Sequence, residues 1–422
     1  MLLVKLLYVL LDGAGDLPDP TLNLVTPLEA AYTPSLDSLA RLGVSGLVYS
    51  VGKGISPESD IAVFNMLSYD FSSNYVGRGV VEAVGAGMEF RDGYLALRGN
   101  FATIDEDLSI IDRRAGRDIS SEEANELAEA IKRYVKLSYK GASFDFVPTV
   151  AHRCTVVFKV EGVNLSANIS NTDPAYTRVS GMGVVSGADY PKSIQKCLPL
   201  DNEESSRLSA SLVNEFSDKA IRVLRSHPVN LKRVKEGKKA ANAILLRDAG
   251  NQLPKIPSIY EKFGMRFACI ADLPVEIGIA RLLGMEVAKA GGLGDYEKKA
   301  EVVLDLLKKF DGVYVHLKGP DEPGHDGNAK MKKRVIEEID RRFFARLIPQ
   351  LDLDETLIVI SSDHSTPCRL KAHTDDPVPL LVVNKRIKRD NTCRFTERDA
   401  AKGSLGVLRG VEVLAKALSL VR

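Results

Sequence analysis

Three segments of the chain share one hydrophobic pattern, a run of apolar and β-branched residues that ends in an acid or a polar cluster. They are LLYVLLDGAGD (Leu6–Asp16), GVYVHLKGPD (Gly312–Asp321) and TLIVISSDHS (Thr356–Ser365). Unbroken apolar runs of this length are typical of strands buried on both faces of a parallel sheet. The pattern therefore predicts three buried parallel strands, the first of which ends at Asp12.

Helical patterns alternate with these strands. Apolar residues recur at helical spacing in YEKKAEVVLDLLKKF, which follows the glycine-rich KAGGLGD, and in KMKKRVIEEIDRRFFARLIPQL. Strands that alternate with helices predict an α/β fold, with a parallel-rich sheet covered by helices. Ligands of such sheets bind beyond the carboxyl ends of the strands. We therefore expect the acids that end the three strands to lie at that edge.

The middle of the chain has a different organisation. Between about Gly93 and Pro254, the strand-like pieces YLALRGNFATID and CTVVFKVEGVNLSANIS are grouped with two polar helical stretches, around SSEEANELAEAIKRYV and LSASLVNEFSDKAIRVLRSH. This grouping predicts an α+β unit. The chain of 422 residues also exceeds the size at which one hydrophobic core usually stops growing. We therefore expect residues 93–254 to form a smaller domain, inserted into a discontinuous core domain of residues 1–92 and 255–422.

Composition narrows the classes of function. Lys and Arg number 57 against 56 Asp and Glu, so the charge balance predicts no nucleic-acid partner. The apolar N-terminal run is short, is interrupted by Lys5 and ends in Asp12, which does not fit a signal peptide. Other segments fall short of the roughly 20 apolar residues of a membrane span. We therefore expect no membrane partner. The five cysteines form no CxxC pair, which predicts neither a disulfide framework nor a zinc site, so we expect a cytoplasmic protein.

Acids and histidines gather at or just beyond the ends of the predicted strands. They are Asp12, Asp321, His325, Asp363, His364 and His373. Carboxylates and imidazoles without a thiolate suit Mn²⁺, Zn²⁺, Co²⁺ or Mg²⁺. Six ligands are too many for one ordinary site and sufficient for two, and paired metal ions about 4 Å apart are a recurring device of phosphoryl transfer. The strand ends therefore predict a two-metal phosphoryl-transfer site.

Phosphoryl transfer also requires an acceptor, and GISPESDIAVFNMLSYD offers Ser59, where a loop turns into an apolar-periodic helix. A serine followed by an acid is a common helix N-cap. A helix N-terminus equally stabilises a phosphate through its free N–H groups and its dipole. From the residues alone, Ser59 is either a cap or the acceptor.

Other features have ordinary structural interpretations. The glycine-rich VGRGVVEAVGAG lacks the preceding strand and the spacing of a dinucleotide-binding fingerprint. His316 lies within a predicted strand and is expected to be packed, and His227 precedes a proline in a helix-ending turn. Cys368 lies close to the metal motif, but nothing provides it with the partner base that a thiol nucleophile requires.

The order of the motifs resembles the alkaline phosphatase superfamily. An Asp-Gly near the N-terminus is followed by PESD, by DEPGHDG, and by DHSTP with a later histidine. More closely, the chain resembles the archaeal type of cofactor-independent phosphoglycerate mutase, nearly end to end, through GNFATID, DRRAGR, NTDPAYTR, SHPVN and DDPVPLLV. Two departures are Glu58 before the serine, where glycine is usual, and LSYDF, where Leu-Gly-Tyr-Asp-Pro is usual. They concern loop geometry and remove no expected ligand.

This resemblance implies a reaction and its cofactors. The phosphate of 3-phosphoglycerate would move to Ser59, glycerate would reorient, and the phosphate would return to the 2-hydroxyl to give 2-phosphoglycerate. Two divalent metal ions and no 2,3-bisphosphoglycerate would be required. The implied ligands are Asp321, His325 and His373 for one ion, and Asp12, Ser59, Asp363 and His364 for the other.

A phosphate and a carboxylate on the substrate also require cationic partners. The candidates implied by the resemblance are His152, Arg153, Asp173, Arg178 and Arg247 in the insertion, and Lys262 in IYEKFGM. Each would otherwise be a solvated or structurally paired charge.

Two rivals stand beside a mutase of glycolysis and gluconeogenesis. One is a metal-dependent phosphatase or a homoserine-kinase-like phosphotransferase with the same metals and serine. The other is a binding protein without turnover, which the joint presence of all the ligands and the serine disfavours.

Overall fold

The structure, a computed structural model, describes residues 4–70, 76–179, 182–185 and 190–421. The chain forms two compact units. The first comprises Met1–Ser73, Ile256–Asp272 and Ile279–Arg422, and the second comprises Asn74–Lys255 and Leu273–Gly278. The second unit begins earlier than the predicted edge at residue 93, because helix α4 (Arg78–Gly85) packs against strands of its sheet.

Within the described residues, the first unit is built on an eight-stranded sheet. Its strand order is β11 (Glu286–Val287), β10 (Phe267–Ile270), β12 (Gly312–Leu317), β1 (Lys5–Leu11), β13 (Thr356–Ser362), β14 (Val378–Val383), β2 (Val44–Tyr49) and β15 (Gly406–Arg409). Strand β14 runs antiparallel to both of its neighbours, and the other neighbouring pairs are parallel. The three strands read from the sequence, β12, β1 and β13, are adjacent, so their carboxyl ends meet at one edge.

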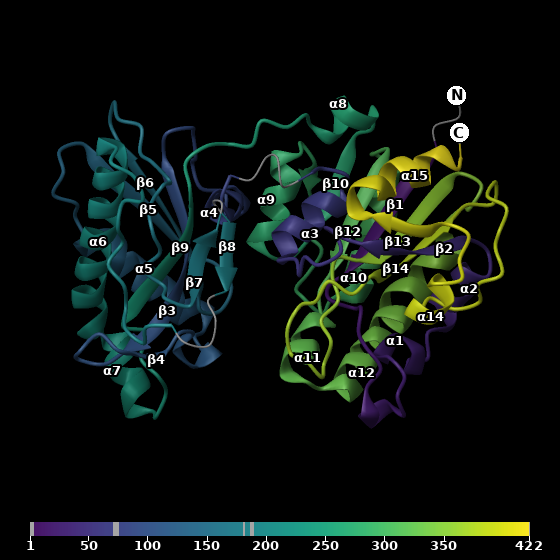
Figure 1. Cartoon of the computed structure of the whole chain (residues 1–422), viewed down its shortest axis with the longest axis horizontal. Coiled ribbons are helices and arrows are strands. Elements are labelled where there is room, and N and C mark those ends of the chain that lie inside the picture. The colour runs from purple at the N-terminus through teal and green to yellow at the C-terminus, as the bar shows by residue number, and fades with distance from the viewer. Residues whose placement is uncertain (1–3, 71–75, 180–181, 186–189, 422) are drawn as a thin grey trace. The chain divides into compact units, whose positions relative to one another are not determined.

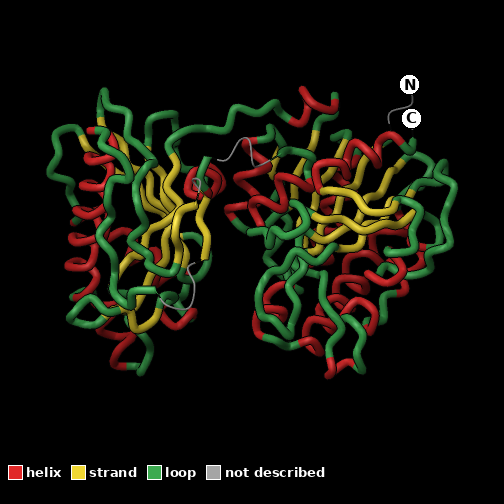
Figure 2. The backbone as a smooth tube through the Cα atoms, viewed as in Figure 1, coloured by secondary structure: helices red, strands yellow, loops and turns green. Residues whose placement is uncertain are grey.

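Helices cover both faces of this sheet (Figures 1 and 2). One face carries α1 (Pro27–Ala30), α2 (Pro34–Ala40), α10 (Tyr296–Leu307) and α12 (Ala329–Ile339). The other carries α3 (Ser59–Met66) and α15 (Val413–Ser419). Val9 of β1 packs in the core of the first face, whereas the Tyr8 hydroxyl donates to the Met66 carbonyl on the second, at 2.9 Å. Because successive strand residues face opposite layers, both of which are buried, the whole run is apolar.

The remaining helices of the first unit are short. They are α8 (Ile259–Phe263), α11 (Asp321–Asp326), α13 (Ala345–Leu347) and α14 (Glu397–Ala400), while α9 (Pro274–Leu282) has residues in both units. The stretch predicted as one helix from Lys330 onward is divided, because a π-helical turn at Asp340–Phe344 separates α12 from α13. Among the helices of the described residues, none has the length and apolar content needed to cross a bilayer.

The second unit has an antiparallel sheet. Its strands are β4 (Ile110–Asp112), β3 (Leu95–Ile104), β6 (Arg153–Val160) and β5 (Ala142–Pro148) in that order, with β9 (Ala243–Gly250) also paired to β3, and a hairpin of β7 (Tyr176–Val179) and β8 (Met182–Val185) beside them. Its longer helices are α5 (Ser121–Tyr134), α6 (Glu204–Arg225) and α7 (Pro228–Lys235).

The core of this unit lies between the sheet and helices α5 and α6. Phe101, Phe146 and Phe158 of the sheet pack there with Phe216 of α6. The predicted fold class, a parallel-rich α/β core with a smaller α+β unit, is therefore confirmed. One predicted strand is shorter than expected: CTVVFKVEGVNLSANIS is extended in β6 only as far as Val160, since the chain turns at Gly162, where φ is +72°.

Candidate active site

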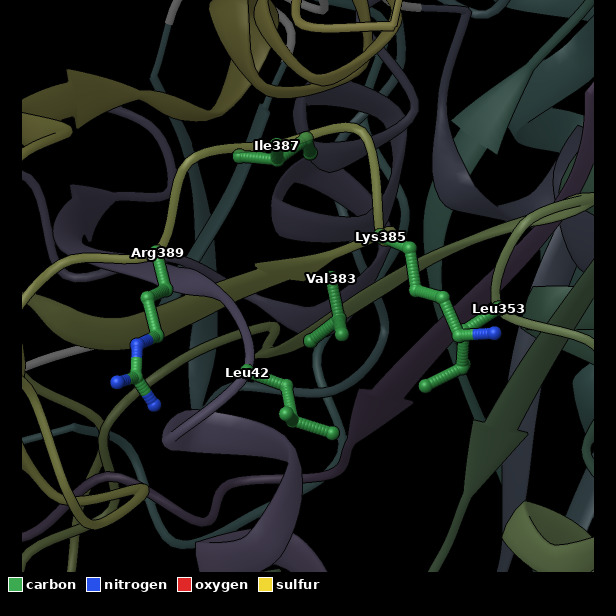
Figure 3. A pocket seen from close by; sticks show the side chains of 6 residues that line it. All are labelled: Leu42, Leu353, Val383, Lys385, Ile387 and Arg389. Atoms are coloured by element: carbon green, nitrogen blue, oxygen red, sulfur yellow. The ribbon is translucent and has the colours of Figure 1, made fainter.

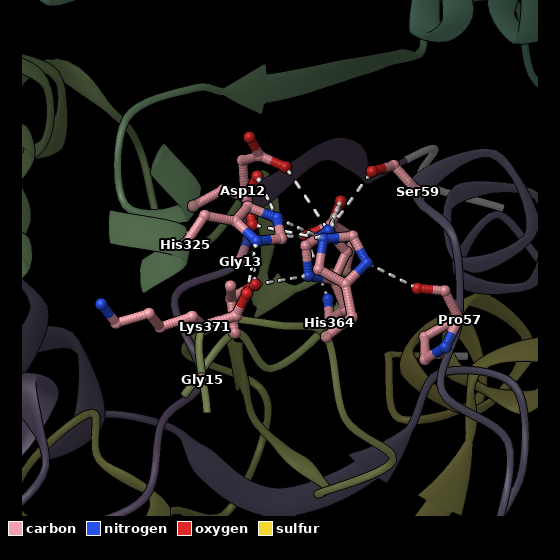
Figure 4. A network of polar contacts seen from close by, with 12 residues as sticks. Asp12, Gly13, Gly15, Pro57, Ser59, His325, His364 and Lys371 are labelled. Atoms are coloured by element: carbon pink, nitrogen blue, oxygen red, sulfur yellow. Dashed lines mark hydrogen bonds and ion pairs between the residues drawn. The ribbon is translucent and has the colours of Figure 1, made fainter. Parts of the chain in front are cut away.

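The predicted metal ligands of the first unit lie together beyond the carboxyl edge of its sheet (Figure 4). They follow β1, β12 and β13, the three strands whose ends meet there. Their ligand atoms form two groups, and within each group the atoms lie within 4.8 Å of one another. The groups are Asp321, His325 and His373, and Asp12, Asp363 and His364.

The first group converges on one point from a helix and a loop. Asp321 and His325 are four residues apart in α11, which places them on one helix face. His325 Nε2 lies 3.1 Å from His373 Nε2, and these atoms lie 3.5 Å and 3.4 Å from the Asp321 carboxylate. The Nδ1 atoms face carbonyl oxygens, of Lys371 at 3.1 Å and of Pro57 at 2.8 Å.

Carbonyl oxygens only accept hydrogen bonds, so both Nδ1 atoms carry protons and a neutral ring presents its Nε2 lone pair. Two lone pairs and a carboxylate facing one another need a cation among them. Although burial opposes a charged ring, the bond to Asp321 raises the pKa of His373 to about 9. The arrangement fits a divalent ion, which would take the place of that proton.

The second group is more deeply buried. Asp363 is fully buried, and its Oδ1 accepts the backbone N–H groups of Gly13 and His364, both at 3.0 Å. Its Oδ2 lies 3.1 Å from His316 Nε2. His316 is fully buried within β12, as expected, and it also contacts this candidate ligand.

Thr366 connects the two groups. Its hydroxyl donates to Asp321 Oδ1 at 2.7 Å and lies 3.0 Å from His364 Nδ1. Because its proton goes to Asp321, the oxygen accepts from His364 Nδ1, and the His364 Nε2 lone pair is directed into the site. Burial lowers the pKa of His364 to about 4, so this imidazole is neutral at pH 7.

Ser59 lies beside this lone pair. It is the first residue of α3, and Glu58 is the N-cap, so the capping interpretation of Ser59 is wrong. Its Oγ lies 3.3 Å from His364 Nε2. Figure 4 shows the two labelled side chains close together. A helix N-terminus at this point also suits a phosphate.

Asp12 supports the fit of a cation in the second group. Its Oδ2 lies 3.1 Å from Lys318 Nζ, whereas its buried Oδ1 makes no hydrogen bond within the described part of the chain. Burial raises the pKa of Asp12 to about 7. A buried oxygen without a partner costs about 1–3 kcal/mol, and a divalent ion would satisfy it.

Comparison with known proteins identifies the family. Residues 40–230 match the profile of a family described as 2,3-bisphosphoglycerate-independent phosphoglycerate mutase. A curated protein of that name from Aeropyrum pernix is 44% identical over 429 residues, covering 99% of this chain and 100% of the relative. The chain belongs to this family of mutases. Another member, from Pyrococcus abyssi, is 38% identical and covers 99% of this chain and 97% of its own.

Solved structures show that family members share the fold. The cofactor-independent phosphoglycerate mutase from Thermoplasma acidophilum aligns with a TM-score of 0.67 at 33% identity, covering 99% of this chain and 100% of that one. A structure of a Pyrococcus horikoshii protein aligns with a TM-score of 0.81 at 32% identity, covering 100% and 98%.

Several residues that the sequence reasoning missed surround the ligands in this member of the mutase family. Lys318, Thr366 and His316 each contact a candidate ligand. The available signal was the polar pair His316 and Lys318 at the end of an otherwise apolar strand, since charged side chains are seldom buried without a partner.

Lys332 of α12 connects the loops that carry the ligands. Its fully buried ammonium donates to the carbonyls of Gly15 and Thr366, both at 2.9 Å, and to Asp16 Oδ2 at 2.8 Å. Asp16 also accepts the backbone N–H of Cys368, at 3.2 Å. Burial raises the pKa of the Cys368 thiol to about 12, so it is not a nucleophile at neutral pH.

Replacing Lys332 by methionine should lower the free energy of unfolding of the metal-free protein by about 3–5 kcal/mol, because Asp16 would remain buried without its cation. Urea titration followed by circular dichroism measures this difference. Lys330→Met, an exposed position on the same helix, is the matched control and should stay within about 0.5 kcal/mol of the wild type. Equal effects of the two substitutions would contradict the role given to Lys332.

Candidate substrate residues in the second unit form a buried charged cluster. Asp173 is fully buried and accepts two bonds from Arg113, at 3.0 Å and 2.6 Å, and one from Arg247 at 3.0 Å. The Arg247 guanidinium lies 4.6 Å from the centre of the Tyr176 ring. Arg113, which the sequence reasoning did not select, is therefore part of the cluster.

The other candidates occupy different environments. His152 is buried, and burial followed by the nearby charges of Arg153 and Arg247 lowers its pKa to about 4. Arg153 is exposed at the start of β6. The Arg178 backbone lies in β7, and its side chain is outside the described residues. In the first unit, the Lys262 ammonium donates to the Ser68 carbonyl and lies 4.2 Å from the centre of the Tyr69 ring.

A hollow in the first unit lies away from these residues (Figure 3). Its lining is Leu42, Leu353, Val383, Lys385, Ile387 and Arg389. Val383 ends the antiparallel strand β14 and pairs with Ile358, near the start of β13. The hollow is therefore at the edge of the sheet opposite the candidate ligands.

Proposed function

We propose that this chain interconverts 3-phosphoglycerate and 2-phosphoglycerate through a phosphoserine at Ser59, without 2,3-bisphosphoglycerate. The observation that carries the proposal is the position of Ser59 Oγ, 3.3 Å from the His364 Nε2 lone pair and beside two groups of candidate metal ligands. The full-length similarity to mutases supports the choice of substrate. By the same reasoning, the reaction would serve glycolysis and gluconeogenesis in the cytoplasm.

Two divalent ions, of Mn²⁺, Zn²⁺, Co²⁺ or Mg²⁺, are proposed for the two ligand groups. The ligands would be Asp321, His325 and His373 for one, and Asp12, Ser59, Asp363 and His364 for the other. Bound there, the ions would neutralise phosphoryl charge and favour the ionised serine. The donor set of oxygens and imidazole nitrogens supports ions of this class.

Different residues of the chain have different roles in the phosphoryl transfer. The Ser59 oxygen gives up its proton and bonds to phosphorus as the bond to the 3-oxygen of glycerate breaks, and the released 3-oxygen takes up one proton, so that the proton count is unchanged. The backbone N–H groups in the first turn of α3 would stabilise the phosphate on Ser59. The 2-oxygen of glycerate then bonds to phosphorus as the bond from Ser59 Oγ to phosphorus breaks; the 2-hydroxyl loses a proton, Ser59 regains one, and 2-phosphoglycerate leaves.

Glycerate has to remain bound between these two steps. We propose that the basic residues of the second unit retain it through charge-assisted bonds to its carboxylate, and that Lys262 contributes from the first unit. The proposed basic residues are His152, Arg153, Arg178 and Arg247, and Asp173 would hold the guanidinium of Arg247 in place.

Arg247→Met should therefore weaken 3-phosphoglycerate binding and raise the ratio of phosphate released to 2-phosphoglycerate formed. A charge-assisted bond contributes about 1.5–3 kcal/mol, which corresponds to roughly 10- to 150-fold in the Michaelis constant. Both products are measured for the variant and for Arg222→Met, an exposed control on α6. If rate, affinity and product ratio all match the control, Arg247 is only a structural charge.

A phosphatase or a homoserine-kinase-like phosphotransferase could use the same metals and serine. The direct test is to incubate the protein with 3-phosphoglycerate and Mn²⁺ and to measure 2-phosphoglycerate and free phosphate. Formation of 2-phosphoglycerate in excess of phosphate supports the mutase. Phosphate alone would identify a phosphatase, and no product at all would identify a binding protein.

A further inference from the structure

We propose that Lys318 is a catalytic residue whose ammonium binds the phosphoryl group during its transfer to and from Ser59. The inference rests on the mutase function proposed above and adds a residue to its machinery. Lys318 lies between the last residue of β12, Leu317, and the candidate ligand Asp321.

The backbone at Lys318 is held in one position. Its carbonyl accepts the Tyr296 hydroxyl of α10 at 2.8 Å. The next residue, Gly319, has a φ of +141°, and a Cβ there would lie 2.5 Å from the Tyr296 oxygen. Because α10 packs closely against Lys318 and Gly319, the backbone that carries the Lys318 side chain is rigid.

The ammonium of Lys318 lies within the cluster that contains the nucleophile. The residue is only 9% exposed, and Nζ lies 3.1 Å from Asp12 Oδ2. Asp12 Oδ1 is 3.7 Å from His364 Nε2, which is 3.3 Å from Ser59 Oγ. Two side chains therefore connect the ammonium to the serine.

Holding a metal ion does not explain a cation at this point. An ammonium beside a metal ligand repels a divalent ion, and this repulsion is considerable in a buried site. With Lys318 counted, Asp12 and Asp363 present a net charge of about −1 to the ion rather than −2. A group that served only to bind metal would omit the lysine.

Phosphoryl transfer does explain it. A phosphate monoester carries up to two negative charges, and in the transition state negative charge is spread over the three non-bridging oxygens. Fixed cations at those oxygens stabilise the transition state more than the ground state, since no reorganisation is needed. The Lys318 ammonium, paired with Asp12 and two side chains away from Ser59, supplies such a charge from a rigid backbone.

The test compares Lys318→Gln, which can still donate a hydrogen bond to Asp12, with Lys318→Arg, which keeps the charge. Lys299→Met is the matched control, because its buried ammonium pairs with Asp272 at 3.1 Å and contacts no candidate ligand among the described residues. For each protein, Mn²⁺ binding to the metal-stripped form is measured by calorimetry. The inhibition constant of inorganic phosphate, kcat and KM are then measured at saturating Mn²⁺.

We expect Lys318→Gln to raise the phosphate inhibition constant at least about tenfold and to lower kcat at least about 100-fold, with Mn²⁺ affinity no weaker than in the wild type. Lys318→Arg should retain most of the phosphate affinity. If Mn²⁺ affinity instead falls about tenfold or more, Lys318 only positions Asp12 and the inference is wrong. An unchanged phosphate constant would overturn it equally.

Failure of the inference can be told apart from failure of the proposed function. A wild-type protein that forms no 2-phosphoglycerate with Mn²⁺ contradicts the mutase proposal before any variant is compared. If Lys318→Gln does not fold, as thermal unfolding would show, Lys318→Met is measured in its place and the same expectations apply to it.

Discussion

Ser59→Ala is expected to abolish mutase activity, with a fall in kcat of at least about 10⁴-fold. The phosphoryl group would have no acceptor, because the alanine side chain carries no oxygen. The fold should be unaffected, since Glu58 rather than Ser59 is the N-cap of α3. The measurement is the rate of 2-phosphoglycerate formation at saturating 3-phosphoglycerate and Mn²⁺.

Two further readouts separate loss of the nucleophile from damage to the site. Mn²⁺ affinity should change little, because only one of the proposed ligand oxygens is lost while the carboxylate and imidazole ligands remain. Intact mass of protein quenched during turnover should show a phosphorylated species for the wild type and none for the variant. Ser38→Ala, at an exposed position of α2, is the control. Appreciable turnover by Ser59→Ala would place the nucleophile elsewhere.

The parallel strands of the sheet, and the grouping of the acids at their ends, could be predicted from the sequence. Unbroken apolar runs that alternate with helices fix parallel strands, and parallel strands end at one edge. Asp12, Asp321 and Asp363 therefore had to lie close together, although 351 positions separate the first from the last in the numbering. Asp12 and Asp363 lie in one ligand group, and Thr366 connects that group to Asp321, in agreement with this expectation.

The side chains around these acids could not be predicted in the same way. Thr366 donates to Asp321 and accepts from His364, and Lys332 bonds to Gly15 and Thr366. Each of these bonds depends on how two loops approach, to within a few tenths of an ångström. Hydrophobic periodicity determines which strands pair and carries no information on that scale.

Ser59 illustrates a second limit of prediction from the sequence. Whether a serine caps a helix depends on a shift of one residue, and helix boundaries are the least certain part of a reading from sequence. The structure starts α3 at Ser59, with Glu58 as the cap. Because Ser59 is the first helical residue rather than the cap, its hydroxyl lies beside His364 instead.

The N-terminal boundary of the second unit illustrates a third limit of prediction from the sequence. The sequence pattern places the glycine-rich VGRGVVEAVGAG in the core domain of residues 1–92, yet this segment contains α4, which packs against the sheet of the second unit. Gly79 lies where a Cβ would come 2.6 Å from the Ala96 carbonyl oxygen, so the glycine permits the close approach of helix and strand. Such a packing requirement at a glycine cannot be told from the sequence alone.

A loss of activity as large as that of Ser59→Ala is expected when a chelator removes the divalent metal: mutase activity should fall to background. In the first ligand group, the Nε2 atoms of His325 and His373 and the Asp321 carboxylate face one another. In the second, Asp12 Oδ1 lies buried without a hydrogen bond in the described residues. Neither group can hold a phosphate unless cations offset its negative charge, so the stripped protein should neither bind substrate tightly nor transfer phosphate.

Adding Mn²⁺, Co²⁺ or Zn²⁺ to the stripped protein should restore activity, whereas 2,3-bisphosphoglycerate should have no effect with or without metal. In the proposed mechanism the phosphoserine is made from the substrate itself, so no priming donor would be needed. The stripped protein should remain folded, because Lys332 and Asp16 still connect the loops, and its melting temperature should rise with metal concentration. Activity that persists after exhaustive chelation, or that depends on the bisphosphate, would exclude a mechanism that needs both ligand groups to be filled by metal.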